Sequence, residues 1–402
     1  MPKKLFVLGG DGICGWPTAL HLSQLGHEVV IVDDLSRRRI DAEMGARSLT
    51  PIASIDVRLS TWRELSGKAI RFEFLDLAQD YDRFVRLLVR ERPDAIVHLA
   101  EQRSAPYSMR GQVTKRYTVD NNVRGTHNLL VALVEADLDC HVVHLGTMGG
   151  YGHHGASFEI PEGYLKIQIT EEGAGLWETD VLFPTRPGSV YHTTASIDQI
   201  LFQYYADNDG LRITDLHQGI VWGTQTRETR LHPGLVNRFD YEGEYGTVLN
   251  RFLVQAALGF PLSVHGTGGQ TRAFIHIEDT VRCIEFAIAD PPRSGERVKV
   301  LNQAAQTLRI RDLAQLVSLV TGAKISFLPS PRNEPAENDL RVSDAAFLAL
   351  GLDPILLTGS LLEETLQISR RYADRVEASQ IEARSPWSPP RRAAGNRNGR
   401  SA

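Results

Sequence analysis

Short runs of aliphatic and β-branched residues recur through the first half of the chain and predict buried strands. They cover residues 5–8, 28–32, 71–74, 95–99, 141–145 and 212–215. These runs do not alternate between apolar and polar positions, so we expect strands buried on both faces, as in a parallel sheet covered by helices. Segments of helical period lie between them, such as 17–25 and 123–136. The pattern predicts an α/β fold with a doubly wound parallel Rossmann sheet.

The regular alternation weakens in the second half of the chain, which predicts a smaller second unit. We expect a Rossmann domain over 1–218 and a mainly substrate-binding C-terminal domain over 219–383, with some return to the Rossmann core. The last residues, 384–402, contain Pro, Gly, Ser and Arg but no acid. That composition predicts a disordered basic tail.

Charge and cysteine usage narrow the class of protein. The 402 residues include 44 Lys and Arg against 49 Asp and Glu, a net charge of −5 that gives no case for a nucleic-acid partner. No apolar run approaches the roughly 18 residues of a membrane helix. The three cysteines, Cys14, Cys140 and Cys283, are far apart and lack CxxC spacing. We expect a cytoplasmic protein with reduced thiols and no metal site.

The first predicted strand runs directly into a glycine-rich segment, residues 9–15, and a helical pattern follows. Glycines at 10, 12 and 15 fit GxGxxG spacing, and those at 9, 12 and 15 fit GxxGxxG. Such glycines let the backbone turn and approach a pyrophosphate, which the helix N-terminus attracts. The second strand ends in Asp33, about 20 residues on, where a carboxylate binds the ribose of NAD and repels the 2′-phosphate of NADP. Arg37 and Arg38 lie close by in the sequence, and a contact of either with a 2′-phosphate weakens the preference for NAD over NADP.

We therefore expect NAD as the cofactor. Asp76 follows the third strand, where it either binds the adenine amino group or caps the strand end. The predicted cofactor-binding residues are Gly9, Gly10, Asp11, Gly12, Ile13, Cys14, Gly15, Asp33, Asp34, Arg37, Asp76, Leu77, Asn121 and Tyr191.

Two hydroxyl-bearing residues are placed for catalysis. Thr147 follows the strand at 141–145, and Tyr191 begins a helical stretch. This arrangement is typical of short-chain dehydrogenases, in which the tyrosine exchanges a proton with a sugar hydroxyl while hydride goes to the nicotinamide. Either residue alone is more often an ordinary core or surface hydroxyl. Together with the NAD loop, the two favour a catalytic pair.

Several longer runs are more specific than the glycine loop. They are GGDGICGWPTALHLS (9–23), SLTPIASI (48–55), EQRSAPYSM (101–109), NNVRGTHN (121–128), LGTMGGYG (145–152), QGIVWG (218–223) and GGQTRAFIHIEDT (268–280). These runs resemble the UDP-sulfoquinovose synthase-like branch of the extended short-chain dehydrogenase/reductase family. The resemblance implies tightly held NAD⁺, transient oxidation of a sugar 4-hydroxyl, loss of the 6-hydroxyl as water, sulfite addition and hydride return. We also expect a homodimer.

The resemblance also assigns roles to residues. It implies that Thr147 binds the reacting hydroxyl, that Tyr191 is the acid/base, and that His192 handles the carbon 5 or leaving-group proton; a surface or interface histidine is the alternative. The residues that match substrate contacts are Arg103, Thr147, Gln218, Arg272 and Arg332. Guanidinium groups suit a diphosphate, although each arginine alone also fits an ordinary ion pair.

Three departures from the family pattern surround the chemistry. The family has a lysine one helical turn after the tyrosine, whose charge lowers the tyrosine pKa, and this chain has Ala195 there. Gly150 stands in place of an acid, and His217 in place of an asparagine. Three functions stay open: a dehydratase-type enzyme on a nucleotide sugar or nucleoside, an authentic UDP-sulfoquinovose synthase that adds sulfite to UDP-glucose, and an inactive NAD-binding scaffold.

Overall fold

The computed structural model describes residues 1–152, 158–171, 175–332 and 334–382. The predicted disordered tail, 384–402, lies outside the described residues. Within the described part, no helix combines the length and apolar character needed to cross a membrane.

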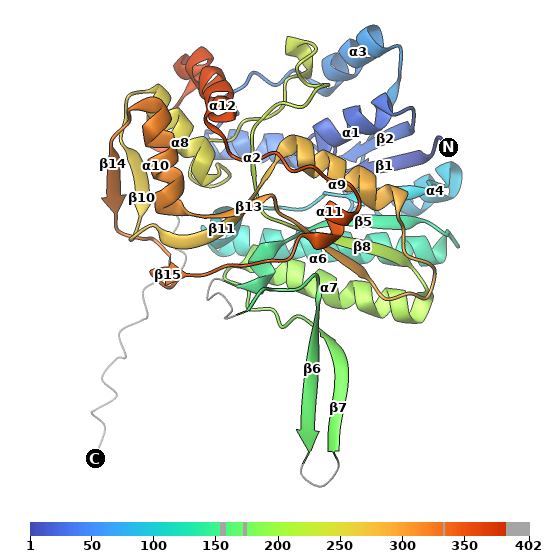
Figure 1. Cartoon of the computed structure of the whole chain (residues 1–402). Helices are drawn as coiled ribbons and strands as arrows, with labels where there is room; N and C mark the ends of the chain where they lie inside the picture. Colours follow the sequence, from blue (N-terminus) through green and yellow to red (C-terminus); the bar gives the residue numbers. More distant parts are fainter. Residues whose placement is uncertain (153–157, 172–174, 333, 383–402) are drawn as a thin grey trace, which may run out of the picture.

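A seven-stranded parallel sheet forms the centre of the molecule (Figure 1). Its strands are β1 (Lys4–Leu8), β2 (Glu28–Asp33), β3 (Ile70–Phe74), β4 (Ala95–His98), β5 (His141–Thr147), β8 (Arg212–Gln218) and β12 (Lys299–Gln303). Their order, β12-β8-β5-β4-β1-β2-β3, reverses direction at β1 and is that of a doubly wound Rossmann sheet. All six predicted strands are confirmed.

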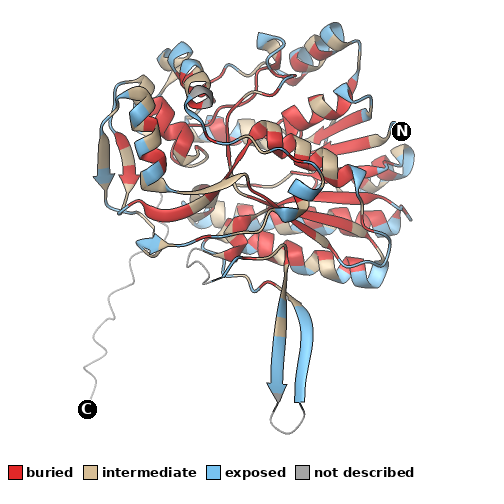
Figure 2. Cartoon of the chain, viewed as in Figure 1, coloured by how far each residue is buried: buried red, intermediate tan, exposed pale blue. Residues whose placement is uncertain are grey.

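Helices cover both faces of this sheet, and the strands are buried between them (Figure 2). Leu5 and Val7 pack in one core with α1 and α9, while Phe6 and Leu8 pack in another with α4, α6 and α7. The helices of this part are α1 (Gly15–Gln24), α2 (Ser36–Met44), α3 (Ile55–Ser66), α4 (Tyr81–Glu91), α5 (Ala105–Met109), α6 (Gln112–Glu135), α7 (Val190–Asp209) and α9 (Ile277–Ala289), with a short 3₁₀ turn η1 (Met148–Tyr151). Burial on both sheet faces explains the uninterrupted aliphatic runs of the strands.

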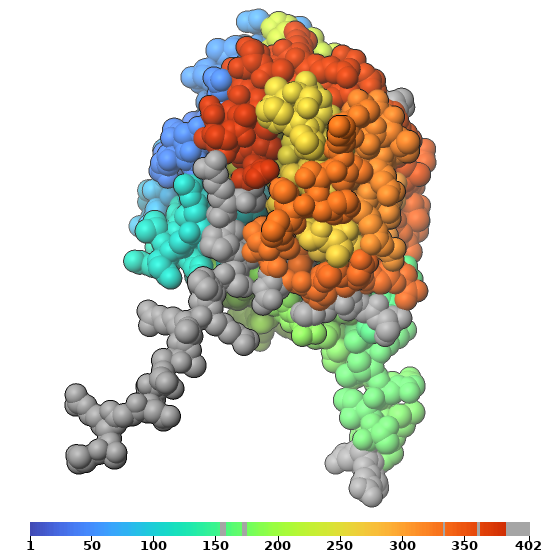
Figure 3. Space-filling view, turned by 90° about the vertical axis from the view of Figure 1, so that its left-hand side faces the viewer, coloured from blue at the N-terminus to red at the C-terminus, as the bar shows by residue number. Residues whose placement is uncertain are grey.

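The second half of the chain builds a smaller unit with its own core, which includes Phe274 and Leu313. Its elements are β9 (Ile220–Trp222), η2 (Pro233–Leu235), α8 (Val248–Ala257), β10 (Leu262–His265), β11 (Gly269–His276), β13 (Gln306–Arg309), α10 (Ile310–Thr321), β14 (Ile325–Leu328), β15 (Glu337–Asn338), α11 (Ala345–Ala349), α12 (Gly359–Arg371), η3 (Ala373–Arg375) and η4 (Ala378–Gln380). In Figure 3 its orange and red residues gather on one face of the molecule. Three elements of this half of the chain, α9, α11 and β12, pack on the Rossmann sheet instead, and Phe347 of α11 belongs to the same core as Leu5 and Val7.

An antiparallel hairpin, β6 (Tyr164–Glu171) and β7 (Gly175–Leu182), projects from the body of the molecule (Figure 1). Ile169 faces Trp177 across the hairpin, and both are exposed (Figure 2). The search for buried strands did not predict this element.

Candidate active site

One cavity of about 420 Å³ opens at the carboxyl ends of the sheet strands, where α/β folds bind their ligands. Every predicted cofactor, catalytic and substrate residue lines it except Gly10. A Cβ on Gly10 would lie 2.5 Å from the Ile31 side chain, so this glycine allows close packing against β2 instead. The sequence prediction thus names residues that the fold brings together from distant positions.

Two glycines of the loop leave no room for a Cβ atom. Gly9 has φ of +80°, and a Cβ there would lie 2.7 Å from the Leu99 carbonyl carbon. A Cβ on Gly15 would lie 2.1 Å from the Gly9 oxygen. The loop backbone therefore approaches the cavity closely where α1 begins, a cradle that fits the pyrophosphate of NAD.

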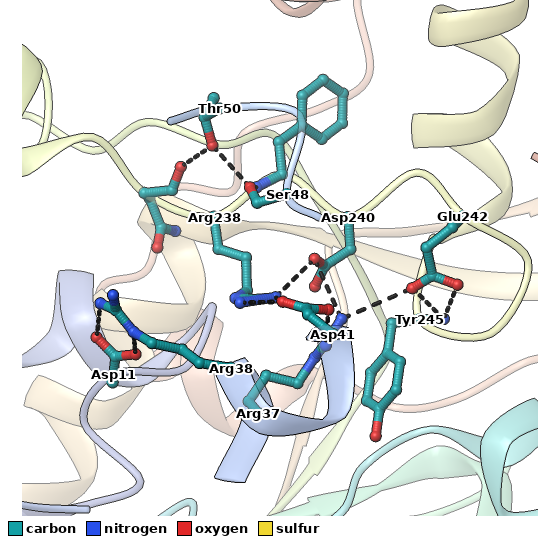
Figure 4. Close-up of polar contacts among 12 residues, drawn as sticks. Asp11, Arg37, Arg38, Asp41, Ser48, Thr50, Arg238, Asp240, Glu242 and Tyr245 are labelled. Carbon is teal, nitrogen blue, oxygen red and sulfur yellow. Dashed lines mark hydrogen bonds and ion pairs between the residues drawn. The ribbon is translucent and has the colours of Figure 1, made fainter. Parts of the chain in front are cut away.

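Asp33 ends β2 and lines the cavity. Its carboxylate accepts hydrogen bonds from the backbone N–H groups of Asp11 (2.9 Å) and Leu35 (2.7 Å), and burial raises its pKa to about 6. Arg38 donates to both carboxylate oxygens of Asp11 (2.6 and 2.8 Å; Figure 4). Arg37 is likewise engaged by carboxylates of the protein. Because both arginines are already paired, this end of the cavity fits NAD better than NADP.

A second segment, residues 237–245, is held against this end by polar contacts that sequence analysis missed. Arg37 pairs with Asp240 (3.3 Å), and its guanidinium lies 3.6 Å from the Tyr245 ring centroid. Ser48 and Thr50, from the SLTPIASI run, bind the Phe239 N–H (2.9 Å) and the Asn237 carbonyl (2.6 Å). We call the polar contacts between residues 37–50 and residues 237–245 the latch (Figure 4). They give the SLTPIASI run a structural role, which is to hold residues 237–245 in place.

The predicted catalytic residues meet deeper in the cavity. Thr147 ends β5 and Tyr191 lies at the start of α7, and both line the cavity. The ring centroids of Tyr191 and His192 lie 5.4 Å apart. Burial raises the Tyr191 pKa, and the Arg103 guanidinium opposes this shift. Arg103 donates to the Leu145 carbonyl and to the Gly146 carbonyl (2.8 Å).

Three arginines line the other end of the cavity: Arg251, Arg272 and Arg332. Burial, together with the positive charges of Arg272 and Arg251, lowers the Arg332 pKa to about 10. Arg272 pairs with Glu334, the acid that faces them. Sequence analysis missed Arg251, although a charged residue within the apolar helix α8 is itself a signal. The excess positive charge suits a polyanionic ligand.

The remaining predicted residues line the same cavity with partners of their own. The Gln218 amide donates to Gln303 (3.2 Å), and Asn121 donates to Asn122 (3.0 Å). Asp76 accepts from the Ala78 N–H (2.9 Å), so it shapes the turn after β3 while facing the cavity.

Comparison with known proteins gives the family. The model of the NAD dependent epimerase/dehydratase family matches residues 5–302. The chain belongs to this family, and its cofactor is NAD. It is 44% identical over 392 residues to the chloroplastic UDP-sulfoquinovose synthase of Spinacia oleracea, covering 96% of this chain and 79% of that protein. It is 38% identical over 356 residues to UDP-sulfoquinovose synthase of Sulfolobus acidocaldarius, covering 87% and 88%.

The fold is shared more widely. A structure of UDP-glucose 4-epimerase from Thermotoga maritima, with UDP-glucose, matches with a TM-score of 0.68 at 20% identity, covering 92% of this chain and 99% of that one. The closer likeness to the two UDP-sulfoquinovose synthases confirms the resemblance that the sequence motifs indicated.

The departures from the family pattern have structural settings of their own. Ala195 is 2% exposed, and no residue of α7 is a lysine or arginine. A side chain at Gly150 would meet Gln199 at 3.6 Å, an ordinary contact distance. His217 does not line the cavity; its ring nitrogens contact Tyr151 (2.6 Å) and Asp215 (2.9 Å).

A row of buried charges leads from the cavity into the core. Glu101 lines the cavity and pairs with His144 (3.2 Å), whose other nitrogen binds Asp215 (2.8 Å). The two carboxylates raise the His144 pKa to about 10. One ligand atom each of His98, Glu101 and His144 lies within 4.8 Å of the others, a spacing a metal ion also needs. Because both His144 nitrogens already bind carboxylates, we interpret the group as an ion-pair row.

Proposed function

We propose that the protein is a dehydratase-type lyase that acts on a nucleotide sugar. It transiently oxidises a sugar hydroxyl, eliminates water across the adjacent exocyclic carbon and returns the hydride. The observation that carries this proposal is that one cavity joins the NAD cradle, the Thr147–Tyr191–His192 group and the three arginines. Bound NAD⁺ supplies a reversible hydride acceptor.

The proposed proton transfers use residues of the described cavity. Thr147 hydrogen-bonds the reacting hydroxyl, and Tyr191 takes its proton as hydride leaves the carbon. The resulting ketone acidifies the neighbouring carbon 5 hydrogen, so one base can remove it. His192 removes this proton or protonates the departing 6-hydroxyl, which leaves as water.

The arginines favour a nucleotide sugar over a nucleoside. Arg251, Arg272 and Arg332 line one end of the cavity, where Glu334 faces Arg272 and Arg332 and Glu242 lies near Arg251. A diphosphate neutralises such a cluster through bidentate contacts, which a nucleoside lacks. Arg103 and Gln218 face the sugar end in this assignment.

The experiment that tests the function is mass spectrometry of products. Purified protein is offered UDP-glucose with and without sulfite, and Tyr191→Phe is the control. We expect loss of water in both samples and none in the variant. A sulfonated sugar formed only with sulfite identifies the authentic UDP-sulfoquinovose synthase. No change in any sample supports the inactive scaffold, which the retained cavity residues disfavour.

We propose a homodimer on separate grounds. The helices α6 and α7 lie side by side and expose Val113 and Val119 on one, and Ile200 and Tyr204 on the other. Sedimentation of the wild type against Ile200→Glu tests this pairing; a monomeric wild type contradicts it. We also propose a cytoplasmic location, supported by three free, buried cysteines that suit a reducing compartment.

A further inference from the structure

The helix that carries Tyr191 supplies no cation to it. Ala195 occupies the position one turn on, is buried, and ends at its methyl group. A buried phenol surrounded by apolar contacts holds its proton more tightly, so a base built on Tyr191 needs positive charge from another element.

Arg103 brings a positive charge to the Tyr191 hydroxyl from a different element of the fold. It follows β4, and two of its nitrogens donate to the Leu145 and Gly146 carbonyls at the end of β5. The guanidinium lines the same cavity as Tyr191 and is close enough to interact electrostatically with its hydroxyl. Two backbone acceptors fix the guanidinium next to the phenol, so its position does not depend on substrate.

We propose that Arg103 is the positively charged partner of the Tyr191 hydroxyl and replaces the lysine that the family carries one turn after the tyrosine. This inference rests on the proposed function, in which Tyr191 exchanges the proton of a sugar hydroxyl. It gives Arg103 a task beyond contact with the substrate.

The charges around Tyr191 support this assignment. Arg103 favours the phenolate, whereas Glu101 opposes it. The Glu101 charge is largely offset by its ion pair with His144 (3.2 Å). Cys14 faces Arg103 as a thiol, since burial raises its pKa. Apart from these groups, the Thr147 hydroxyl also favours the phenolate by lowering the pKa of Tyr191, and the His192 ring lies alongside.

An arginine suits this place for a physical reason. Its planar group uses several donors at once, so it binds two carbonyls and still reaches the phenol. It also stays charged throughout the working pH range, so its effect on Tyr191 does not itself titrate. An opposite charge at such range lowers an acid's pKa by about 1–3 units.

The test compares Arg103→Met, Arg103→Lys and the double variant Arg103→Met/Ala195→Lys. The first readout is the titration of Tyr191 by NMR in protein labelled with carbon-13 at the tyrosine Cζ, assigned by the signal lost in Tyr191→Phe. We expect Arg103→Met to move this titration upward by about one unit or more, and Arg103→Lys by less. This readout needs no turnover, so it separates the inference from the proposed function.

The second readout is the pH dependence of kcat and KM. We expect Arg103→Met to lower kcat by about 10-fold or more, because one pKa unit changes the phenolate fraction tenfold. The pH at which kcat rises as Tyr191 loses its proton should also move upward. The added Ala195→Lys change in the double variant should restore part of both. The matched control is Arg272→Met, an arginine of the same cavity away from Tyr191, which should raise KM and leave the profile unchanged.

Two results would overturn the inference. One is an unchanged Tyr191 titration in Arg103→Met with only KM raised, which would leave Arg103 a substrate contact. The other is a lower kcat in Arg103→Met with neither the titration nor the profile moved. A further experiment adds methylguanidinium to the Arg103→Ala variant, and it does not depend on the folding of the methionine variant. Recovery of the wild-type Tyr191 titration supports the inference, and failure in a folded variant contradicts it.

Discussion

The imidazole of His192 packs against Gly149 so closely that any larger residue at position 149 would collide with it. A Cβ on Gly149 would lie 2.3 Å from the His192 Nε2, whereas one on the next glycine, Gly150, would meet its nearest neighbour at 3.6 Å. The two glycines sit in the same 3₁₀ turn, η1, for different reasons. The sequence shows both as glycines of one motif, and only the packing separates them.

We predict that Gly149→Ala impairs turnover as strongly as His192→Ala does. An added methyl displaces the imidazole, and loss of a positioned acid/base costs about 10²-fold or more. Gly150→Ala is the control and should retain activity, since its methyl makes ordinary contacts. Steady-state turnover of the three purified variants, with NAD content measured in each, checks this. Equal activity in Gly149→Ala and wild type would contradict a role for His192.

NAD binding should depend on pH through Asp33. Its pKa in the protein is about 6, above the usual value of an aspartate, because burial disfavours the charge. Ribose hydroxyls donate to the ionised carboxylate and stabilise it, so affinity should rise as pH increases through about 6, by up to tenfold per unit below it. Calorimetric titration of cofactor-stripped protein measures this. Asp33→Asn should bind weakly at every pH, and a persisting pH dependence in that variant would contradict the assignment.

At the scale of elements, the latch joins two segments that lie about 200 positions apart in the chain. Arg238 donates to Asp41 of α2 (2.6 Å), and Arg37 from the same helix pairs with Asp240 and Glu242. These groups are largely buried, so breaking one pair leaves charges without partners, which costs more than an exposed pair. The latch therefore holds residues 237–245 over the end of the cavity that fits the adenosine of NAD.

We predict that Asp240→Ala loosens cofactor retention. Removing the carboxylate frees Arg37 and Arg238 from one shared partner, so residues 237–245 should open more often and release NAD faster. The measurement is the NAD content of protein after gel filtration, read after heat denaturation. Arg90→Ala, which removes two ion pairs of an exposed residue that does not line the cavity, is the control and should keep its NAD. Full retention in Asp240→Ala would show that the latch does not hold the cofactor.

The elements themselves were predictable to different degrees. The central strands follow from the sequence because burial on both faces requires aliphatic runs. Helix α6 starts at Gln112, well before the predicted 123. Its first half carries mostly polar side chains without an apolar stripe, so the hydrophobic pattern did not predict this part of the helix. The hairpin of β6 and β7 does alternate, with Leu165, Ile167 and Ile169 on one face, a pattern that a search for buried strands passes over. The latch pairs side chains across long separations, which no local pattern reveals.

At the scale of the whole molecule, the cavity combines residues of the Rossmann sheet with residues of the smaller unit. The motif resemblance predicted nearly all of the Rossmann side, since four of the motifs, at 9–23, 101–109, 145–152 and 218–223, lie at the ends of parallel strands along the same edge. It found Arg272 and Arg332 of the smaller unit but not Arg251 or His265, which line the same cavity outside the family motifs, nor Gln270, which lies within the motif at 268–280.

The outcome of the reaction should reflect what this assembled site lacks. Gly150 and Ala195 remove a carboxylate and an ammonium that the resembling family carries, so fewer charges orient an anionic nucleophile such as sulfite. Carbon 5 deprotonation needs only the neighbouring ketone and one base, and Tyr191 and His192 both face the cavity.

With UDP-glucose in deuterated water and no sulfite, we therefore expect deuterium incorporation or a new exocyclic alkene, with no net NADH. Mass spectrometry and absorbance at the NADH band measure both, and Gly150→Glu/Ala195→Lys should gain sulfite addition relative to the wild type. An obligatory need for sulfite, or stoichiometric NADH with a simple keto-sugar, would contradict this outcome, and the latter would make the enzyme a plain dehydrogenase.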